Sequence, residues 1–255
     1  MKDQMVFYFD LLFEMTSREI KARYKNTAFG FLWAFINPIL QMIVIGIILQ
    51  NFVRIDNTNY YVFVYSGLIL WNFFSSTLIK TTPSILYDRA LIRKAKFPYS
   101  VIPLSIIFSN FIQTLPSLGI ILIVTGLLRP TTIYLVLSLL CSVFLLLLFT
   151  IGISLCTTAL NVRFRDINFF IQALLIVWFY ATPILYPASM LPTTYNWIWV
   201  LNPLTTIVQL AQYATSNSPP PPVILMSINS ATIVLMFILG IFIFETHSPY
   251  FDDLI

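Results

Sequence analysis

Residues 132–160 read TIYLVLSLLCSVFLLLLFTIGISLCTTAL, without a charged side chain anywhere in the stretch. The hydrocarbon core of a bilayer is about 30 Å thick, and roughly 20 helical residues cross it. No water reaches that core, so the backbone groups of a spanning segment must be hydrogen-bonded internally. The stretch also lacks the apolar–polar alternation of a barrel strand. It therefore predicts a transmembrane helix.

The same pattern recurs along the chain. Further uncharged apolar runs occupy residues 32–53, 61–79, 99–128, 167–186 and 223–244. Of all residues, 58% are hydrophobic and 9% charged, against roughly 45–50% and about 25% in soluble domains. We expect an all-α integral membrane protein with six transmembrane helices. Residues 1–31 would form an interface helix, 32–244 the transmembrane domain and 245–255 a cytoplasmic tail.

Positive charges are distributed unevenly around these runs. Of the 14 Lys and Arg residues, only Arg54 and Arg129 fall outside the N-terminal segment and the second-to-third and fourth-to-fifth connections. Loops rich in Lys and Arg remain in the cytoplasm, so we expect a multi-pass protein with both termini cytoplasmic. The net charge of +4 needs no nucleic acid to explain it. Basic residues would also favour anionic lipid headgroups or a phosphate-bearing substrate.

The segment before the first run has helical periodicity. Its apolar stripe is Val6, Phe9, Phe13, Ile20 and Tyr24, and its polar stripe is Glu14, Arg18, Lys21 and Lys25. This pattern predicts an amphipathic helix in the cytoplasmic interface, with Glu14 and Arg18 spaced for an ion pair. Simple anchoring and a functional gate are equally compatible with it.

The second cytoplasmic connection, residues 80–100, reads KTTPSILYDRALIRKAKFPYS. Thr82 and Pro83 resemble a helix cap and first helical position, and Pro98 closes the segment, which predicts one helix of about a dozen residues. A basic helix projecting from a membrane suits a cytoplasmic partner. The alternative is a solvated positive loop.

Residues 187–222 are uncharged and rich in aromatic side chains and proline. They predict one or two short re-entrant or interfacial helices on the outer face. The run Pro219–Pro222 would form a stiff connector. The sequence has no internal repeat, so any two-fold symmetry of a translocation path should come from dimerisation.

Several chemistries have no support in the sequence. It contains no G-x-x-x-x-G-K-[ST] motif, so we expect the chain not to bind ATP in the P-loop manner. His247 is the only histidine, and no group of side chains has metal-ligand or Ser/His/Asp spacing. The six runs contain no ionisable residue, which argues against ion-coupled transport.

Aromatic residues are abundant in and beside the runs. Rings at this depth serve packing or interface anchoring, but rings lining a pore would also let sugars slide past without tight binding. The candidates for such a path are Trp33, Phe35, Trp71, Phe73, Phe74, Trp178 and Tyr180.

Six motifs in order and spacing cover nearly the whole chain. They are REIKARYKNTAFGFLWAFINPIL at 18–40, SGLILWNFFSSTL at 66–78, LIRKAKFPYSVIPL at 91–104, ALNVRFRDI at 159–167, ATPILYP at 181–187 and LNPLTTIV at 201–208. Together they resemble the permease subunits of type-2 ABC exporters for O-antigen polysaccharides and wall teichoic acids. The proline-rich connector before the sixth run is unusual for that pattern.

The resemblance implies a homodimer in the bacterial cytoplasmic membrane, bound to two separate ATPase subunits that hold ATP and Mg. This chain itself would bind no cofactor. The substrate would be an undecaprenyl-linked glycan, with drug or small-lipid export as the alternative within this class. An ion-coupled flippase or a structural assembly subunit are the alternatives outside it.

The resemblance also assigns roles to residues. The basic residues Arg18, Lys21, Arg23 and Lys25 of a gate helix would meet the pyrophosphate of the lipid carrier. A coupling helix between Pro83 and Pro98 would contact the ATPase through Asp88, Arg89, Arg93, Lys94 and Lys96. Residues 183–203 would form an outer re-entrant hairpin. The cytoplasmic turn containing Arg163, Arg165 and Asp166 would contact substrate or be fixed by a local Arg–Asp pair.

Overall fold

Every regular element in the described part of the chain is helical. The structure is a computed structural model, and it describes residues 2–25, 29–50, 59–94, 97–128, 130, 132–190, 194 and 196–254. Short 3-10 turns accompany the α-helices, which are α1 (Lys2–Tyr24), α2 (Trp33–Ile48), α3 (Tyr60–Thr81), α4 (Ser84–Tyr87), α5 (Arg89–Ile92), α6 (Val101–Leu128), α7 (Ile133–Arg163), α8 (Asp166–Ala181), α9 (Asn196–Leu201), α10 (Pro203–Ser216), α11 (Val223–His247) and α12 (Phe251–Leu254). The all-α prediction is confirmed. Arg54, Lys96 and Arg129 lie outside the described residues.

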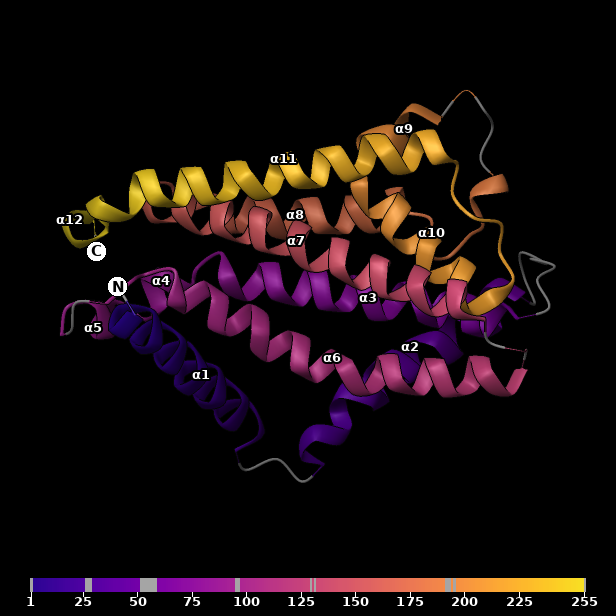
Figure 1. The fold of residues 1–255 in the computed structure, drawn as a ribbon, viewed down its shortest axis with the longest axis horizontal. Helices are drawn as coiled ribbons and strands as arrows, with labels where there is room; N and C mark the ends of the chain where they lie inside the picture. The colour runs from indigo at the N-terminus through magenta and orange to yellow at the C-terminus, as the bar shows by residue number, and fades with distance from the viewer. Residues whose placement is uncertain are drawn as a thin grey trace.

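Four helices, α3, α6, α7 and α11, are long and apolar enough to cross a membrane. They run along the length of the bundle, and both chain termini lie at one end of it (Figure 1). Each of the six predicted runs coincides with one helix, but α2 and α8 have only 16 residues each. At 1.5 Å per residue, each of these two is about 24 Å long.

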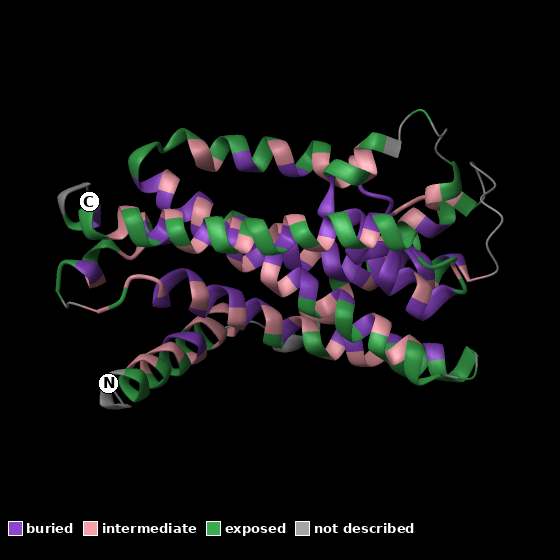
Figure 2. Cartoon of the chain, turned by 45° about the horizontal axis from the view of Figure 1, so that its top comes forward, coloured by how far each residue is buried: buried purple, intermediate pink, exposed green. Residues whose placement is uncertain are grey.

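The core of the bundle forms around α3. Its aromatic side chains pack with residues of α7, α8 and α10, and α10 has nearly every side chain buried. Figure 2 shows buried residues concentrated through the middle of the bundle and exposed residues along its outer helices. Many of those exposed residues are large and apolar, such as Leu127 on α6 and Ile224 on α11. A bilayer would cover such surfaces without cost.

Helices α7 and α11 approach most closely at two glycines. A Cβ atom built on Gly240 would lie 2.0 Å from the carbonyl oxygen of Gly152, and one on Gly152 would lie 2.6 Å from the carbonyl oxygen of Met236. Any side chain at either position would collide with backbone. Small residues at the crossing therefore permit the contact between these two helices.

A second apolar cluster lies at the end of the bundle that carries the termini, called here the terminal end. It includes Met15 of α1, Ile85 of α4, Ile92 of α5 and Phe251 of α12, packed on the ends of α6, α7 and α11. The hydroxyl of Tyr99 donates a 2.7 Å hydrogen bond to Asp252. The pKa of Tyr99 is raised to about 12, mainly because of this bond. The C-terminal segment is thus folded back against the bundle.

Two local predictions were wrong. The single helix expected between Pro83 and Pro98 is replaced by two one-turn helices, α4 and α5, that meet at Asp88. Thr82 does not begin a helix but ends α3, and its hydroxyl donates to the carbonyl of Leu78 at 2.8 Å. Pro83, which has no N–H, precedes α4 as its N-cap. The segment is therefore interrupted at Asp88 and does not form one continuous helix.

Helix α1 lies against α6, but the predicted apolar stripe mostly faces away from the bundle. The side chains of Phe9 and Phe13 are 59% and 73% exposed, whereas Leu12 and Met15 pack on the terminal-end cluster. Outward-facing rings beside a bilayer fit the predicted interface position. The expected Glu14–Arg18 ion pair was wrong, because in the described residues Arg18 pairs with Glu19 and Asp88 instead.

Candidate functional site: a polar pocket around Arg23

A polar pocket lies among α1, α2, α3 and α6. Its volume is about 300 Å³. Amide and hydroxyl side chains from three of these helices line it, together with one cation and two large rings. The lining includes Arg23, Trp33, Asn37, Asn72, Phe73, Ser75, Ser76, Asn110, Gln113, Thr114 and Ser117.

Arg23 reaches into this pocket from the end of α1. Its guanidinium donates to the side-chain oxygens of Asn110, at 2.5 Å, and of Gln113. The hydroxyl of Tyr24 donates to the same Gln113 oxygen at 2.8 Å. Burial lowers the pKa of Arg23, while the neighbouring Tyr24 and Glu19 raise it. An arginine remains cationic at neutral pH in spite of such a shift.

Two hydrogen bonds between side chains and one from a side chain to a backbone carbonyl connect the helices around the pocket. The amide of Asn72 on α3 donates to Gln41 on α2 at 2.8 Å, and the amide of Asn110 on α6 donates to Thr77 on α3 at 2.9 Å. The hydroxyl of Ser117 on α6 donates to the carbonyl of Ala34 on α2 at 3.3 Å. Such bonds hold polar groups in place within otherwise apolar helices.

These amides were not predicted as site residues. Asn110 and Gln113 were considered only as uncharged members of an apolar run, and Asn72 only as part of such a run and of the motif at residues 66–78. Their signal was nevertheless present, because an amide in a lipid-spanning helix is costly unless it is paired or functional.

Of the four predicted gate cations, Arg18, Lys21 and Arg23 lie on α1, and Lys25 directly follows it. Arg18, Lys21 and Lys25 line a separate surface depression, whereas Arg23 lines the polar pocket. Lys80, at the end of α3, interacts unfavourably with the positive charge of Arg23, and Glu19 partly offsets this. Arg23 is the one cation among the described residues that line the pocket, and its positive charge favours an anion.

The predicted path aromatics also separate into groups. Trp33, 49% exposed, and Phe73 line the polar pocket. Phe74 is fully buried, stacked on Phe149 at 5.6 Å and in edge contact with Trp178 at 5.3 Å. Trp71 is buried in the same cluster, Phe35 is half-buried and Tyr180 is exposed.

Trp178 has a further contact that fixes the α8–α10 junction. Its indole N–H donates to the side-chain oxygen of Asn202 at 2.8 Å, and the Asn202 amide donates to Thr182 at 2.9 Å. Asn202 also accepts from the backbone N–H of Leu204 and so caps α10. In this conformation Trp178, Trp71 and Phe74 are packing residues.

Comparison with known proteins agrees with this architecture. The family described as "ABC-2 type transporter" matches residues 10–215. The chain belongs to the ABC-2 type transporter family. It is 35% identical over 215 residues to an O-antigen export system permease protein RfbA of Klebsiella pneumoniae, covering 82% of this chain and 81% of the relative. A protein of the same name from Myxococcus xanthus is 30% identical over 249 residues, which is 96% of this chain and 95% of the relative.

In this ABC-2 transporter chain, the predicted coupling residues cluster at the terminal end. The side chains of Arg89, Arg93 and Lys94 are exposed, as is that of Tyr87. Beneath them, Ile85 and Ile92 are buried in the terminal-end cluster. The surface of the segment is therefore basic, while its underside is packed on α6 and α7.

The turn between α7 and α8 was predicted either to contact substrate or to be fixed by a local Arg–Asp pair, and the structure bears only on the second of these roles. Arg163, Arg165 and Asp166 are all exposed, and no ion pair joins them in the described residues. Instead the side-chain oxygen of Asn161 accepts from the backbone N–H of Asn168 at 3.2 Å. Asp166 lies in the first turn of α8, where a negative charge favours the helix.

Proposed function

We propose that this chain is the membrane-spanning subunit of an ATP-driven exporter that moves lipid-linked polysaccharide of O-antigen type across the bacterial cytoplasmic membrane. The observation that carries the proposal is the polar pocket around Arg23, set among apolar helices. The name of the Myxococcus xanthus relative, which matches along nearly the full chain, agrees with it.

The chemistry of the pocket fits a sugar attached to a lipid phosphate. A guanidinium binds phosphate oxygens through a fork of N–H donors, and Arg23 is held in place by Asn110 and Gln113. The amides and hydroxyls deeper in the pocket suit sugar hydroxyls, which both donate and accept hydrogen bonds. Trp33 and Phe73 add ring faces for the apolar sides of sugar rings. The lipid tail would remain beside the exposed apolar side chains of α2.

We place six helices across the membrane, with α2 and α8 as short spans. Each is about 6 Å shorter than the hydrocarbon core, a mismatch that local thinning of the bilayer or burial in an oligomer accommodates. The distribution of Lys and Arg favours cytoplasmic termini. The terminal end then faces the cytoplasm, and the junction of α8, α9 and α10 forms a re-entrant hairpin on the outer side.

The partners in this proposal are a second copy of the chain and two ATPase subunits, which bind ATP and Mg. The basic surface of α4 and α5, with Arg89, Arg93 and Lys94 exposed, would bind the ATPase. Buried Ile85 and Ile92 would pass its movement to α1, α6 and α7. Homodimerisation would supply the symmetry that the sequence lacks within one chain.

Deletion of the gene, followed by fractionation of lipid-linked glycans, tests the proposal. We expect polymer on its lipid carrier to accumulate on the cytoplasmic side, with reversal by the intact gene but not by a variant carrying Arg23→Gln. Normal surface glycan in a strain without a second exporter would refute polysaccharide export and move the substrate to a drug or small lipid. Failure of an ATPase to copurify would refute the proposed assembly.

A further inference from the structure

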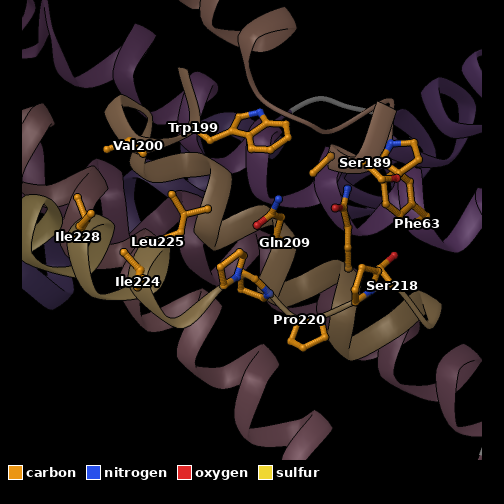
Figure 3. A pocket seen from close by; sticks show the side chains of 16 residues that line it. Phe63, Ser189, Trp199, Val200, Gln209, Ser218, Pro220, Ile224, Leu225 and Ile228 are labelled. Atoms are coloured by element: carbon orange, nitrogen blue, oxygen red, sulfur yellow. The ribbon is translucent and has the colours of Figure 1, made fainter. Parts of the chain in front are cut away.

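A larger cavity, unrelated to the pocket around Arg23, lies at the end of the bundle opposite the termini. Its volume is about 590 Å³. Helices α9 and α10, the start of α11 and the run Pro219–Pro222 enclose it, and Phe63 at the start of α3 closes one side (Figure 3). This is the size of a small-molecule site, and apolar walls with a few polar groups are typical of one.

Among the described residues of the lining, two buried polar atoms have no hydrogen-bond partner. They are the indole N–H nitrogen of Trp199 and the side-chain carbonyl oxygen of Gln209, both buried. The side chain of Gln209 is only 8% exposed, and Figure 3 shows it at the centre of the lining between Trp199 and Pro220. A buried donor or acceptor without a partner lowers the stability of the fold. A ligand that supplied the missing partners would restore that stability.

We propose that this cavity binds one neutral saccharide unit, with Trp199 as hydrogen-bond donor and Gln209 as acceptor. The described residues of the lining carry no charged side chain, so none of them would compensate the charge of a phosphate or carboxylate. A sugar hydroxyl both accepts and donates, and it can therefore satisfy the indole N–H and the amide oxygen. An acyl chain would leave both atoms unpaired. The assignment rests on the proposed function, because a saccharide is the part of that cargo which emerges at this end.

The walls of the cavity suit the apolar faces of a sugar ring. Trp199 and Phe63 supply rings, and Leu225 and Pro220 supply aliphatic surface. Asn217, which has a left-handed φ of 58°, ends α10 and directs the chain into the proline run. Prolines have no N–H and restricted backbone torsions, so this wall is stiff and adds no competing donor. The unusual connector thereby acquires a role as a preformed wall of the site.

Ligand-observed saturation-transfer NMR on the full chain in lipid nanodiscs tests the assignment. The probes are methyl glycosides of glucose, galactose, mannose and N-acetylglucosamine. We expect at least one of them to bind the wild type with millimolar affinity. The variants Gln209→Leu and Trp199→Phe, which keep volume or ring but remove the polar atom, should each weaken that binding about five- to tenfold.

Matched controls lie outside the cavity. Gln172→Leu changes an exposed glutamine of α8, and Trp197→Phe changes an exposed tryptophan two residues from Trp199. Both should bind the glycoside like the wild type, and all four variants should keep the wild-type melting temperature within a few degrees. Equal weakening by the controls, or no glycoside binding at all, would overturn the assignment. So would a bound lipid that the glycoside cannot displace.

The export assay separates this inference from the proposed function. Cytoplasmic accumulation of glycan on deletion, together with absent glycoside binding, would overturn the saccharide site alone. Normal surface glycan on deletion would overturn the proposed function and with it the rationale for this ligand.

Discussion

The guanidinium of Arg18 lies 3.4 Å from a carboxylate oxygen of Asp88, which joins α1 to the turn between α4 and α5. Burial is the largest influence on the Asp88 carboxyl and raises its pKa, while Arg18 acts to lower it. The pKa of Asp88 is therefore higher in the folded protein than in the unfolded chain. For this reason the carboxyl stabilises the fold at pH values below the pKa that it has in the unfolded chain. That contribution is lost as pH rises through the folded value. The contact is therefore a specific link between two segments and not a strong stabiliser.

Exchange of the two charges tests this link. Arg18→Asp and Asp88→Arg should each place like charges together and reduce ATP-driven export, whereas the double variant should recover much of it. Both side chains are partly exposed, so folding stability should change by only about 1 kcal/mol or less. Export and thermal unfolding are measured on all three variants. A double variant no more active than either single variant would show that the pairing is unimportant for transport.

Arg23 should be more sensitive than the other basic residues of α1. Arg23→Gln removes the positive charge beside the buried amides of Asn110 and Gln113 and should reduce export about tenfold or more. Arg23→Lys keeps the charge but not the fork of donors and should be intermediate. Export is compared with that of Lys21→Gln, which changes a residue of the separate surface depression. A larger loss with Lys21→Gln would assign phosphate binding to the surface depression.

Phe74 and Trp33 should respond differently to truncation. Phe74 is fully buried between Phe149 and Trp178, so Phe74→Ala should cost about 3–5 kcal/mol of folding stability. Trp33 is half exposed and lines the pocket, so Trp33→Ala should leave folding nearly intact and reduce export. Thermal unfolding in detergent and export in cells separate the two effects. A Phe74→Ala protein that is stable but inactive would instead support the predicted role of Phe74 in the sugar path.

Arg93 and Lys94 offer a test of ATPase docking. Both are exposed at the terminal end, above the buried Ile92. Reversal of both charges to Glu should abolish copurification of the ATPase while membrane insertion persists. The same reversal at exposed Arg163 and Arg165 serves as the comparison. Retained ATPase binding in the Arg93/Lys94 variant would refute the docking role of α5.

The long helices could be predicted from the sequence because their apolar side chains favour the bilayer over water. An uncharged apolar run of membrane length has few alternatives to a helix, and each predicted run coincides with one helix. The sequence does not decide which face of α1 meets the bundle, since Phe9 and Phe13 on one side and Leu12 and Met15 on the other are all apolar. Only tertiary packing decides which side meets the bundle.

The candidate site was predicted in part. Arg23 was chosen for its charge and Trp33 for its ring, but their amide partners were not chosen. Asn72 and Asn110 lie far apart along the chain, and only the packing of α3 against α6 brings them to one pocket. The broken segment at Asp88 was missed because Thr82 and Pro83 carry the signature of a helix start. In the folded protein Thr82 instead ends α3.

The α7–α11 crossing gives a prediction that depends on geometry alone. Gly240→Ala would place a Cβ atom 2.0 Å from the backbone of Gly152, and backbone cannot move aside as a flexible side chain can. We therefore expect the variant to separate the two helices and to lose most folded protein. Gly119→Ala is the matched control, because nothing lies within 4 Å of its Cβ position on α6. Alanine favours a helix by about 1 kcal/mol over glycine, so the control should be as stable as the wild type or more so. Size-exclusion profiles and melting temperatures in detergent measure both variants, and a Gly240→Ala protein that melts with the control would show that the crossing tolerates a wider spacing.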